Sequence, residues 1–173
     1  MKFSQAICIA ICAAALIAPL SAYADEKGGC DDFAWPVKTE LQWMKAADSE
    51  AVTSGAKLQA APAKAITLAL QPMDKVAFPV APTSRKKPTA ANGGFITFDS
   101  IGEPGTYQVS LAARGWIDII QDGKPLKSSA HTGKSECDGV RKSVRFPIAP
   151  GPVVIEISGV EKDSIKLTVR REE

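Results

Sequence analysis

Histidine is almost absent from this sequence, which contains one in 173 residues, His131. A single histidine cannot supply the two-histidine, one-carboxylate triad that holds iron in non-haem dioxygenases, so that chemistry is not expected. The sequence also lacks the G-x-S-x-G motif that places a nucleophilic serine on a sharp turn in α/β-hydrolases. These absences favour a protein without a catalytic centre, and neither a metal nor a cofactor is predicted.

An excess of charge of either sign is also missing. The chain carries 21 Lys and Arg side chains against 19 Asp and Glu side chains. A protein that binds nucleic acid usually shows a clear basic excess, so a nucleic-acid partner is not predicted. The one tight basic run, Arg85-Lys86-Lys87, lies between two prolines and is typical of a solvated loop, with contact to an anionic surface as the alternative.

Long apolar segments are missing after the first 20 residues. The run from Ala6 to Leu20 follows Lys2 and precedes Ala22-Tyr23-Ala24, which has the form of an A-x-A cleavage site. This run is shorter than the roughly 20 residues that span a bilayer comfortably. We therefore predict a signal peptide over residues 1–24 that is cleaved after Ala24, a periplasmic protein and no stable membrane span. A retained signal anchor is the alternative.

Cysteine is scarce, and half of it lies in the predicted signal peptide. Removal of Cys8 and Cys12 leaves Cys30 and Cys137, an even pair in an oxidising compartment, which predicts one disulfide. The bond would close a loop of 106 intervening residues. On the chain-entropy model such a loop stabilises the fold by about 4–5 kcal/mol. The alternative, a metal site, would lack the second pair of ligands that zinc requires.

Short alternating segments between Gly, Pro and Asp turns are what the sequence has in abundance. Tyr107, Val109 and Leu111 alternate with polar residues, and this period of two is typical of a half-buried strand. Asp122-Gly123 is a strong hairpin signal. The eight expected strands are residues 65–70, 76–80, 95–99, 106–112, 115–121, 140–146, 152–158 and 164–170. They predict an all-β fold, an antiparallel, jelly-roll-like β-sandwich.

One short helix is expected before the strands, over residues 31–47. Val37, Leu41 and Met44 share one apolar stripe, and the two tryptophans of this segment flank it as packing residues. Asp31 or Asp32 is a suitable N-cap. Residues 48–64 are small and polar and predict a loop. The expected organisation is therefore a signal peptide at 1–24, a helix and linker at 25–64 packed on the sandwich, and a sandwich domain at 65–173.

Three stretches of residues 94–170 follow one another in a distinctive order of strands and turns. They are Phe95–Phe98 followed by Gly105–Leu111, Trp116–Ile120 followed by Asp122–Leu126, and Pro150–Ile157 followed by Ile165–Val169. In this order the chain resembles the bacterial pre-peptidase C-terminal domain. The resemblance implies a compact jelly-roll-like sandwich without catalytic residues. Members of that family are usually attached to secreted hydrolases, where they are thought to help secretion or substrate contact.

Trp116 and Asp118 are the first candidate ligand-binding pair, because they share one face of an expected strand. If that face is exposed, the indole can stack on a sugar ring while the carboxylate accepts the sugar hydroxyls. The alternative, which is the more common arrangement, places Trp116 in the core. Asp118 would then satisfy a neighbouring backbone group or Arg114.

Arg141 and Arg145 are the second candidate set, since they oppose the apolar face of their strand. Lys166 and Arg170 have the same position on the last strand. If these two strands are neighbours, they form a basic outer face that can bind an anionic partner; an ordinary charged sheet surface is the alternative.

The leading hypothesis is an exported, non-catalytic β-sandwich module that binds an envelope glycan or an envelope protein. Two alternatives stay open. A small exported enzyme would use loop residues near His131, although a solvent-facing His131 in its polar loop, residues 128–139, is the simpler interpretation. The other alternative is a structural or stress-protective envelope protein with no small ligand.

Overall fold

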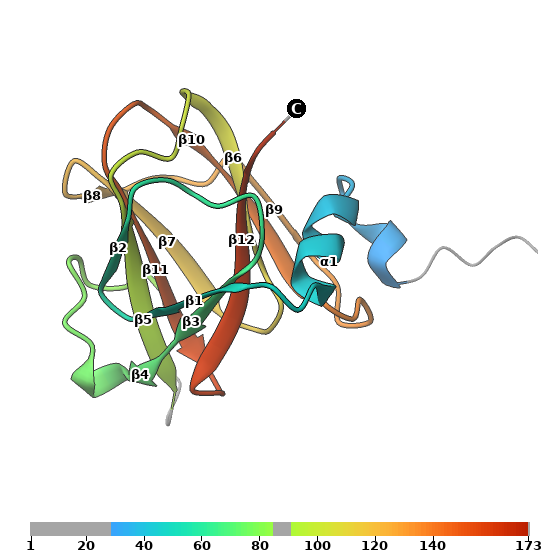
Figure 1. Ribbon diagram of the computed structural model, residues 1–173, viewed down its shortest axis with the longest axis horizontal. Coiled ribbons are helices and arrows are strands. Elements are labelled where there is room, and N and C mark those ends of the chain that lie inside the picture. Colours follow the sequence, from blue (N-terminus) through green and yellow to red (C-terminus); the bar gives the residue numbers. More distant parts are fainter. Residues whose placement is uncertain (1–28, 85–90, 173) are drawn as a thin grey trace, which may run out of the picture.

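Two packed β-sheets form the body of the computed structural model, which describes residues 29–84 and 91–172 (Figure 1). The first sheet has, in spatial order, β1 (Glu50–Thr53), β3 (Ile66–Ala69), β12 (Ser164–Arg171), β6 (Gly105–Leu111), β10 (Lys142–Ile148) and β9 (Ala130–Gly133). The second has β2 (Ala56–Leu58), β5 (Asn92–Phe98), β11 (Val153–Val160), β7 (Trp116–Gln121) and β8 (Lys124–Pro125), with β4 (Gln71–Pro72) paired to β5. The expected all-β sandwich is confirmed, while the jelly-roll topology stays a prediction.

Several sequence predictions fall on parts of the chain that the structure does not describe. The signal peptide at 1–24, its cleavage after Ala24 and the basic run Arg85–Lys87 lie outside the described residues. Within the described ranges, no helix has the length and apolar character needed to cross a membrane.

The core lies between the sheets and is built by the alternating residues of both. Ile117 and Ile119 of β7 meet Ile155 and Ile157 of β11 in one apolar cluster with Leu167 of β12, and each of these side chains is at most 4% exposed. Burying such side chains stabilises the fold by about 1.5–3 kcal/mol each. The period of two therefore identifies the inner face of each long strand correctly.

The turn between β7 and β8 has the predicted hairpin geometry. Asp122 and Gly123 have φ values of 52° and 71°. A two-residue turn with positive φ at both positions matches the right-handed twist of the flanking strands. The β7–β8 hairpin at Asp122-Gly123 is confirmed.

The expected strand at 76–80 is wrong. Residues 76–84 instead form an extended segment without ladder partners, which we call the strap, after a short 3₁₀ helix, η2 (Met73–Lys75). Pro79 and Pro82 explain the difference, because proline has no N–H to donate to a ladder. The backbone N–H groups of Val80 and Thr83 donate to side chains of β11 and β7, so the strap lies over the outer face of the second sheet.

The expected loop at 48–64 contains two strands. β1 pairs with β3 and β2 pairs with β5, both in parallel register, so the sheets are not purely antiparallel. Each of these strands has only three or four residues, too few for an alternating pattern to be recognised. β9 likewise occupies part of the polar loop at 128–139 and pairs antiparallel with β10.

The helix is shorter than expected. α1 covers Lys38–Lys45 with Val37 at its N-cap, and a separate 3₁₀ turn, η1, covers Gly29–Asp32. Pro36 accounts for the break, because the residue before a proline is disfavoured in the α conformation. No aspartate side chain caps α1. Val37 and Met44 are buried as the apolar stripe predicts.

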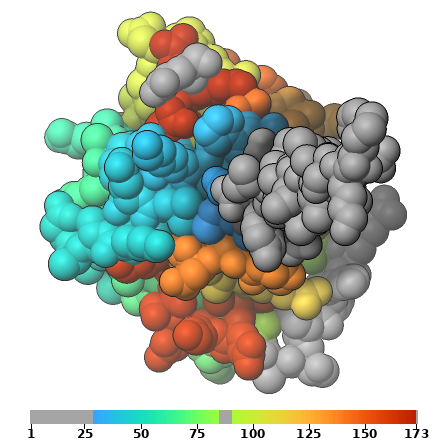
Figure 2. All heavy atoms as spheres, turned by 90° about the vertical axis from the view of Figure 1, so that its right-hand side faces the viewer, coloured from blue at the N-terminus to red at the C-terminus, as the bar shows by residue number. Residues whose placement is uncertain are grey.

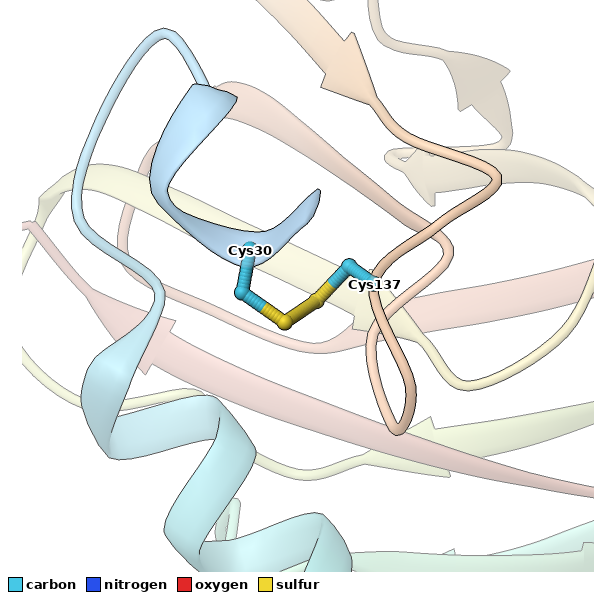
Figure 3. Close-up of a disulfide and its surroundings, with 2 residues drawn as sticks. All are labelled: Cys30 and Cys137. Carbon is cyan, nitrogen blue, oxygen red and sulfur yellow. A yellow bond between two sulfur atoms is a disulfide. The ribbon is translucent and has the colours of Figure 1, made fainter. Parts of the chain in front are cut away.

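A disulfide joins Cys30 in η1 to Cys137 in the loop after β9, as Figure 3 shows. The prediction of this bond is confirmed. Cys137 is buried in a second apolar cluster with Phe33, Trp35 and Val140, separate from the core between the sheets. Figure 2 shows this side of the molecule, where the cyan N-terminal segment lies beside orange residues of the β9–β10 region. The disulfide therefore fixes the N-terminal segment against the first sheet.

A polar layer lies between α1 and the first sheet. Glu40 is fully buried and accepts hydrogen bonds from Arg170 Nε, at 2.8 Å, and from Gln108 Nε2. Lys166 Nζ donates to the carbonyl oxygens of Met44 and Ala46 at 2.9 and 3.2 Å, at the C-terminal end of the helix. Arg170 and Lys166 therefore stabilise the contact between α1 and the first sheet.

The basic outer face expected from neighbouring strands that carry Arg141, Arg145, Lys166 and Arg170 does not form. β6 lies between β10 and β12, so these two strands are not neighbours. The guanidinium of Arg145 stacks on Trp35, 4.1 Å from the ring centroid, and pairs with Glu172 at 2.5 Å. The face is covered because the N-terminal segment packs on it with Trp35 and Glu40, while Glu172 after β12 supplies the counter-charge for Arg145.

Candidate functional site

A groove of about 580 Å³ lies where the start of β7, the edge strand β9 and the start of β10 come together. Its lining residues include Arg114, Trp116, His131, Arg141 and Lys142. A neighbouring hollow of about 280 Å³ shares Trp116, His131 and Lys142 with the groove. Pockets of 300–1,000 Å³ are typical of small-molecule sites, so the larger groove can take a ligand of modest size.

Trp116 stands on the surface at this groove. It is 41% exposed and is the one large apolar side chain exposed among the residues that the structure describes. Its Nε1 donates to Asp118 Oδ1 and to Thr83 Oγ1, each at 3.1 Å. The alternative that places Trp116 in the core is therefore wrong, because its side chain lies on the face of β7 opposite to the core residues Ile117 and Ile119.

Asp118 holds the indole in place. The carboxylate is 6% exposed and accepts the backbone N–H of Thr83 at 3.0 Å and its hydroxyl at 2.5 Å, besides the Trp116 indole. Its partners are thus the strap and the indole, and no ion pair to Arg114 is found among the described residues. Asp118 orients Trp116 and anchors the strap instead of offering free oxygens to a sugar.

Positive charge gathers at the groove. Arg114 is exposed in the turn before β7, and Arg141 and Lys142 are half-buried at the start of β10. Lys142 Nζ lies 4.8 Å from the centroid of the Trp116 ring. Burial lowers the pKa of Lys142, while the charge of Asp118 acts in the opposite direction. Lys142 was not among the sequence candidates, because its contact with Trp116 joins strands of different sheets.

Arg145 is the one predicted ligand residue that the structure places elsewhere. It lies beneath Trp35, whose Nε1 donates to Ser143 Oγ at 3.2 Å. The Nε of Arg145 is buried without a hydrogen-bond partner among the described residues. Arg145 therefore belongs to the contact between the first sheet and the N-terminal segment.

His131 is exposed on β9 and lines both hollows. Its exposure agrees with the solvent-facing interpretation. Within residues 29–84 and 91–172, no cluster of three metal-ligating side chains is found. In the same ranges the imidazole makes no hydrogen bond to a serine or a carboxylate, the contact that would mark a catalytic triad.

A second buried carboxylate lies behind Trp116. Glu156 on β11 is directly opposite Asp118 on β7, is 1% exposed, and accepts the backbone N–H of Val80 at 3.0 Å. Its Oε2 is buried without a partner in the described residues. Burial raises the pKa of Glu156 to about 7; the Val80 hydrogen bond opposes this rise and Asp118 adds to it. The one sign of this site in the sequence is that a charged residue, Glu156, lies between the apolar residues Ile155 and Ile157 of an expected strand.

The structure thus brings Trp116, Asp118, Arg114 and Arg141 to one place and adds Lys142 and Thr83, which sequence reasoning missed. Thr83 has no recognisable signal in the sequence, because its role depends on the path of the strap across the sheet.

Comparisons of the chain with protein-family models, with curated proteins and with solved structures gave no match.

Proposed function

We propose that this protein is an exported, non-catalytic β-sandwich module that binds an envelope glycan in the groove beside Trp116. The observation that carries the proposal is the exposed indole, held by Asp118 and Thr83 at the rim of a groove. Stacking on an aromatic face is a common way to bind the apolar side of a ligand whose edges are polar. Because the ring is already oriented, little conformational entropy is lost on binding.

The character of the groove supports binding over glycoside hydrolysis. Hydrolysis of a glycosidic bond normally requires two carboxyl groups that flank the scissile bond. Among the described residues that line the larger groove, none is Asp or Glu. Asp118, in the adjoining hollow, already accepts three hydrogen bonds.

Export is part of the same proposal. The A-x-A site before Asp25 and the pairing of Cys30 with Cys137 support a mature chain that begins at Asp25 and works in the periplasm. The resemblance of residues 94–170 to the pre-peptidase C-terminal domain implies a sandwich without catalytic residues, which is consistent with a non-catalytic module.

Glycan binding is tested with the mature protein on a glycan array and with a peptidoglycan pull-down, followed by calorimetry on any ligand found. We expect Trp116→Ala to weaken binding about tenfold or more, as truncation of a central tryptophan usually does. Trp43→Ala is the matched control, because it removes an indole from the helix side of the molecule. Thermal unfolding of both variants verifies that they are folded.

A wild-type protein that binds no glycan would overturn the proposal and leave the structural or stress-protective role. Capture of an envelope protein that depends on Trp116 would replace the glycan with a protein partner. The enzyme alternative is addressed by screening esters, glycosides and phenolics with the wild type and His131→Ala. Turnover lost in that variant would contradict a non-catalytic module.

A further inference from the structure

We infer that the Trp116 groove selects saccharides that carry an anionic group, a carboxylate or a phosphate, over their neutral counterparts. The inference rests on the glycan-binding function proposed above and names the class of sugar. Trp116 would contact the ring of the saccharide, while Arg114, Arg141 and Lys142 meet its charge.

The charge balance of the groove carries the inference. Among its described lining residues, Arg114, Arg141 and Lys142 are cationic and none is acidic. The adjoining hollow adds Lys127 and one acid, Asp118, whose oxygens already accept hydrogen bonds from Thr83 and Trp116. Neither arginine side chain forms a hydrogen bond or ion pair within residues 29–84 and 91–172. The charge of Asp118 acts on Lys142, whereas no ion pair of Arg114 or Arg141 is found among the described residues, so the balance of charge at the groove is positive.

Besides Asp118, the acidic residue Glu136 also interacts with this charge. The pKa of Glu136 is lowered chiefly by a hydrogen bond from Ser135, with smaller contributions from Arg141 and Lys134. Glu136 is exposed, so solvent and salt screen its effect on Arg141. It therefore does not cancel the positive charge of the groove.

The cations reach the groove from both sheets. Arg114 lies in the turn that leads into β7 of the second sheet, whereas Arg141 and Lys142 lie at the start of β10 in the first. The backbone of Arg141 is anchored, because its N–H donates to Leu111 O at 2.7 Å and its carbonyl accepts from Lys134 N at 3.2 Å. Cationic side chains of both sheets can therefore contact a ligand in the groove from two sides.

The contact between Lys142 and Trp116 links the sugar ring to its charge. With Nζ 4.8 Å from the centroid of the indole ring, an anionic substituent on a sugar beside that ring comes within reach of the ammonium group. The planar guanidinium groups of Arg114 and Arg141 match the geometry of carboxylate and phosphate oxygens. A neutral saccharide would keep the ring contact and could accept hydrogen bonds from the three cations through its hydroxyl groups, but it would lack the stronger bonds that an anionic group forms with them.

The test compares saccharides that differ only in charge. Binding of the mature protein is measured by calorimetry for oligogalacturonate and its methyl ester, for a sugar phosphate and its dephosphorylated form, and for inorganic phosphate alone. Arg114→Gln and Arg141→Gln are the test variants. Lys124→Gln is the matched control, because it removes an exposed charge at the other end of the β7–β8 hairpin.

We expect one charged saccharide to bind about tenfold or more tightly than its neutral form, the effect of one hydrogen bond to a charged group. Each arginine variant should lose about that factor for the charged form and leave the affinity for the neutral form unchanged. Lys124→Gln should behave as the wild type. Raising NaCl from about 0.05 to about 0.5 M should reduce the preference, since screening shortens the range of the charges.

Three results would overturn the inference, and they separate it from the proposed function. Equal affinity for charged and neutral forms, lost in Trp116→Ala, would remove the anionic preference and keep the glycan site. Binding of inorganic phosphate as tight as that of the sugar phosphate would show an anion site without a sugar contact. Binding of no saccharide in either pair, with none on the array, would remove both proposals.

Discussion

Glu156 is the residue whose environment differs most from what its place in the sequence suggests. It lies in an apolar strand, opposite Asp118 and under the strap, with one oxygen bonded to Val80 and the other buried without a partner among the described residues. Two carboxylates that face each other away from water favour protonation of one of them. At this position the sequence reveals the glutamate but not the strap that covers it.

The raised pKa of Glu156 makes stability depend on pH. The folded value of about 7 exceeds the ordinary value of 4.5, so between these values the folded state binds more protons than the unfolded state. The contribution of Glu156 to the free energy of unfolding is therefore largest below about pH 4.5, and this contribution is lost as the pH rises through about 7.

Glu156→Gln removes this titration and keeps an oxygen for the Val80 N–H. We expect the variant to be more stable than the wild type at pH 8 by about 1–2 kcal/mol, and the difference to shrink towards pH 5. Urea unfolding at both pH values measures it. Wild-type and variant stabilities that change in parallel with pH would show that Glu156 is not the titrating group.

At the scale of elements, α1 is attached to the first sheet by a buried polar contact as well as by its apolar stripe. Glu40 is fully buried, and Arg170 is its charged partner. Removing the buried carboxylate takes away the acceptor of the hydrogen bonds from Arg170 and Gln108, and breaking such a contact costs more than the pair itself contributes.

Glu40→Ala should therefore lower the free energy of unfolding by about 3 kcal/mol. Glu50→Ala is the matched control, because Glu50 pairs with Lys64 at 3.2 Å on the surface, and such exposed pairs are worth less than about 1 kcal/mol. Urea unfolding of the two variants makes the comparison. Equal losses would mean that the Glu40 contact is no stronger than a surface ion pair.

Strands long enough to show alternation were predictable, and short or unpaired ones were not. β6, β7 and β12 lie within one residue of their expected bounds. β1 and β2 were missed because their partners lie far along the chain and three or four residues carry no period. The strap was mistaken for a strand because an alternating pattern does not reveal whether a ladder partner exists.

At the scale of the whole molecule, the disulfide ties the first described element to a loop more than a hundred residues away. Cys30–Cys137 holds η1 and α1 over the polar layer of the first sheet, where the apolar contact is confined to a second, smaller cluster. Constraining a loop of this length acts mainly by reducing the entropy of the unfolded chain.

The double variant Cys30→Ser, Cys137→Ser should lose about 4 kcal/mol of stability on the chain-entropy model. Urea unfolding measures the loss, and non-reducing mass spectrometry of the wild type verifies the bond. Two free thiols in the mature wild-type protein would contradict the bond itself. An unchanged unfolding free energy would indicate that the N-terminal segment contributes little to the cooperative unit.

The local features of this protein follow from its amino-acid sequence alone. Strand periodicity set the inner faces of β6, β7 and β12, the Asp122-Gly123 pair set a hairpin, and the count of cysteines set the disulfide. Each of these follows from residues close in the chain, or from a pairing with no competitor.

The covering of the outward faces and the position of the groove depend on how distant segments pack together. Arg145 became a structural residue because Trp35 and Glu172 pack on it, whereas Trp116, on an outward strand face, stays exposed and donates its indole N–H to Thr83 and Asp118. The groove gathers residues from β7, β9 and β10, which are brought together by burial of the core between the sheets. Burial and charge pairing act between segments distant in the chain, so no local pattern encodes them.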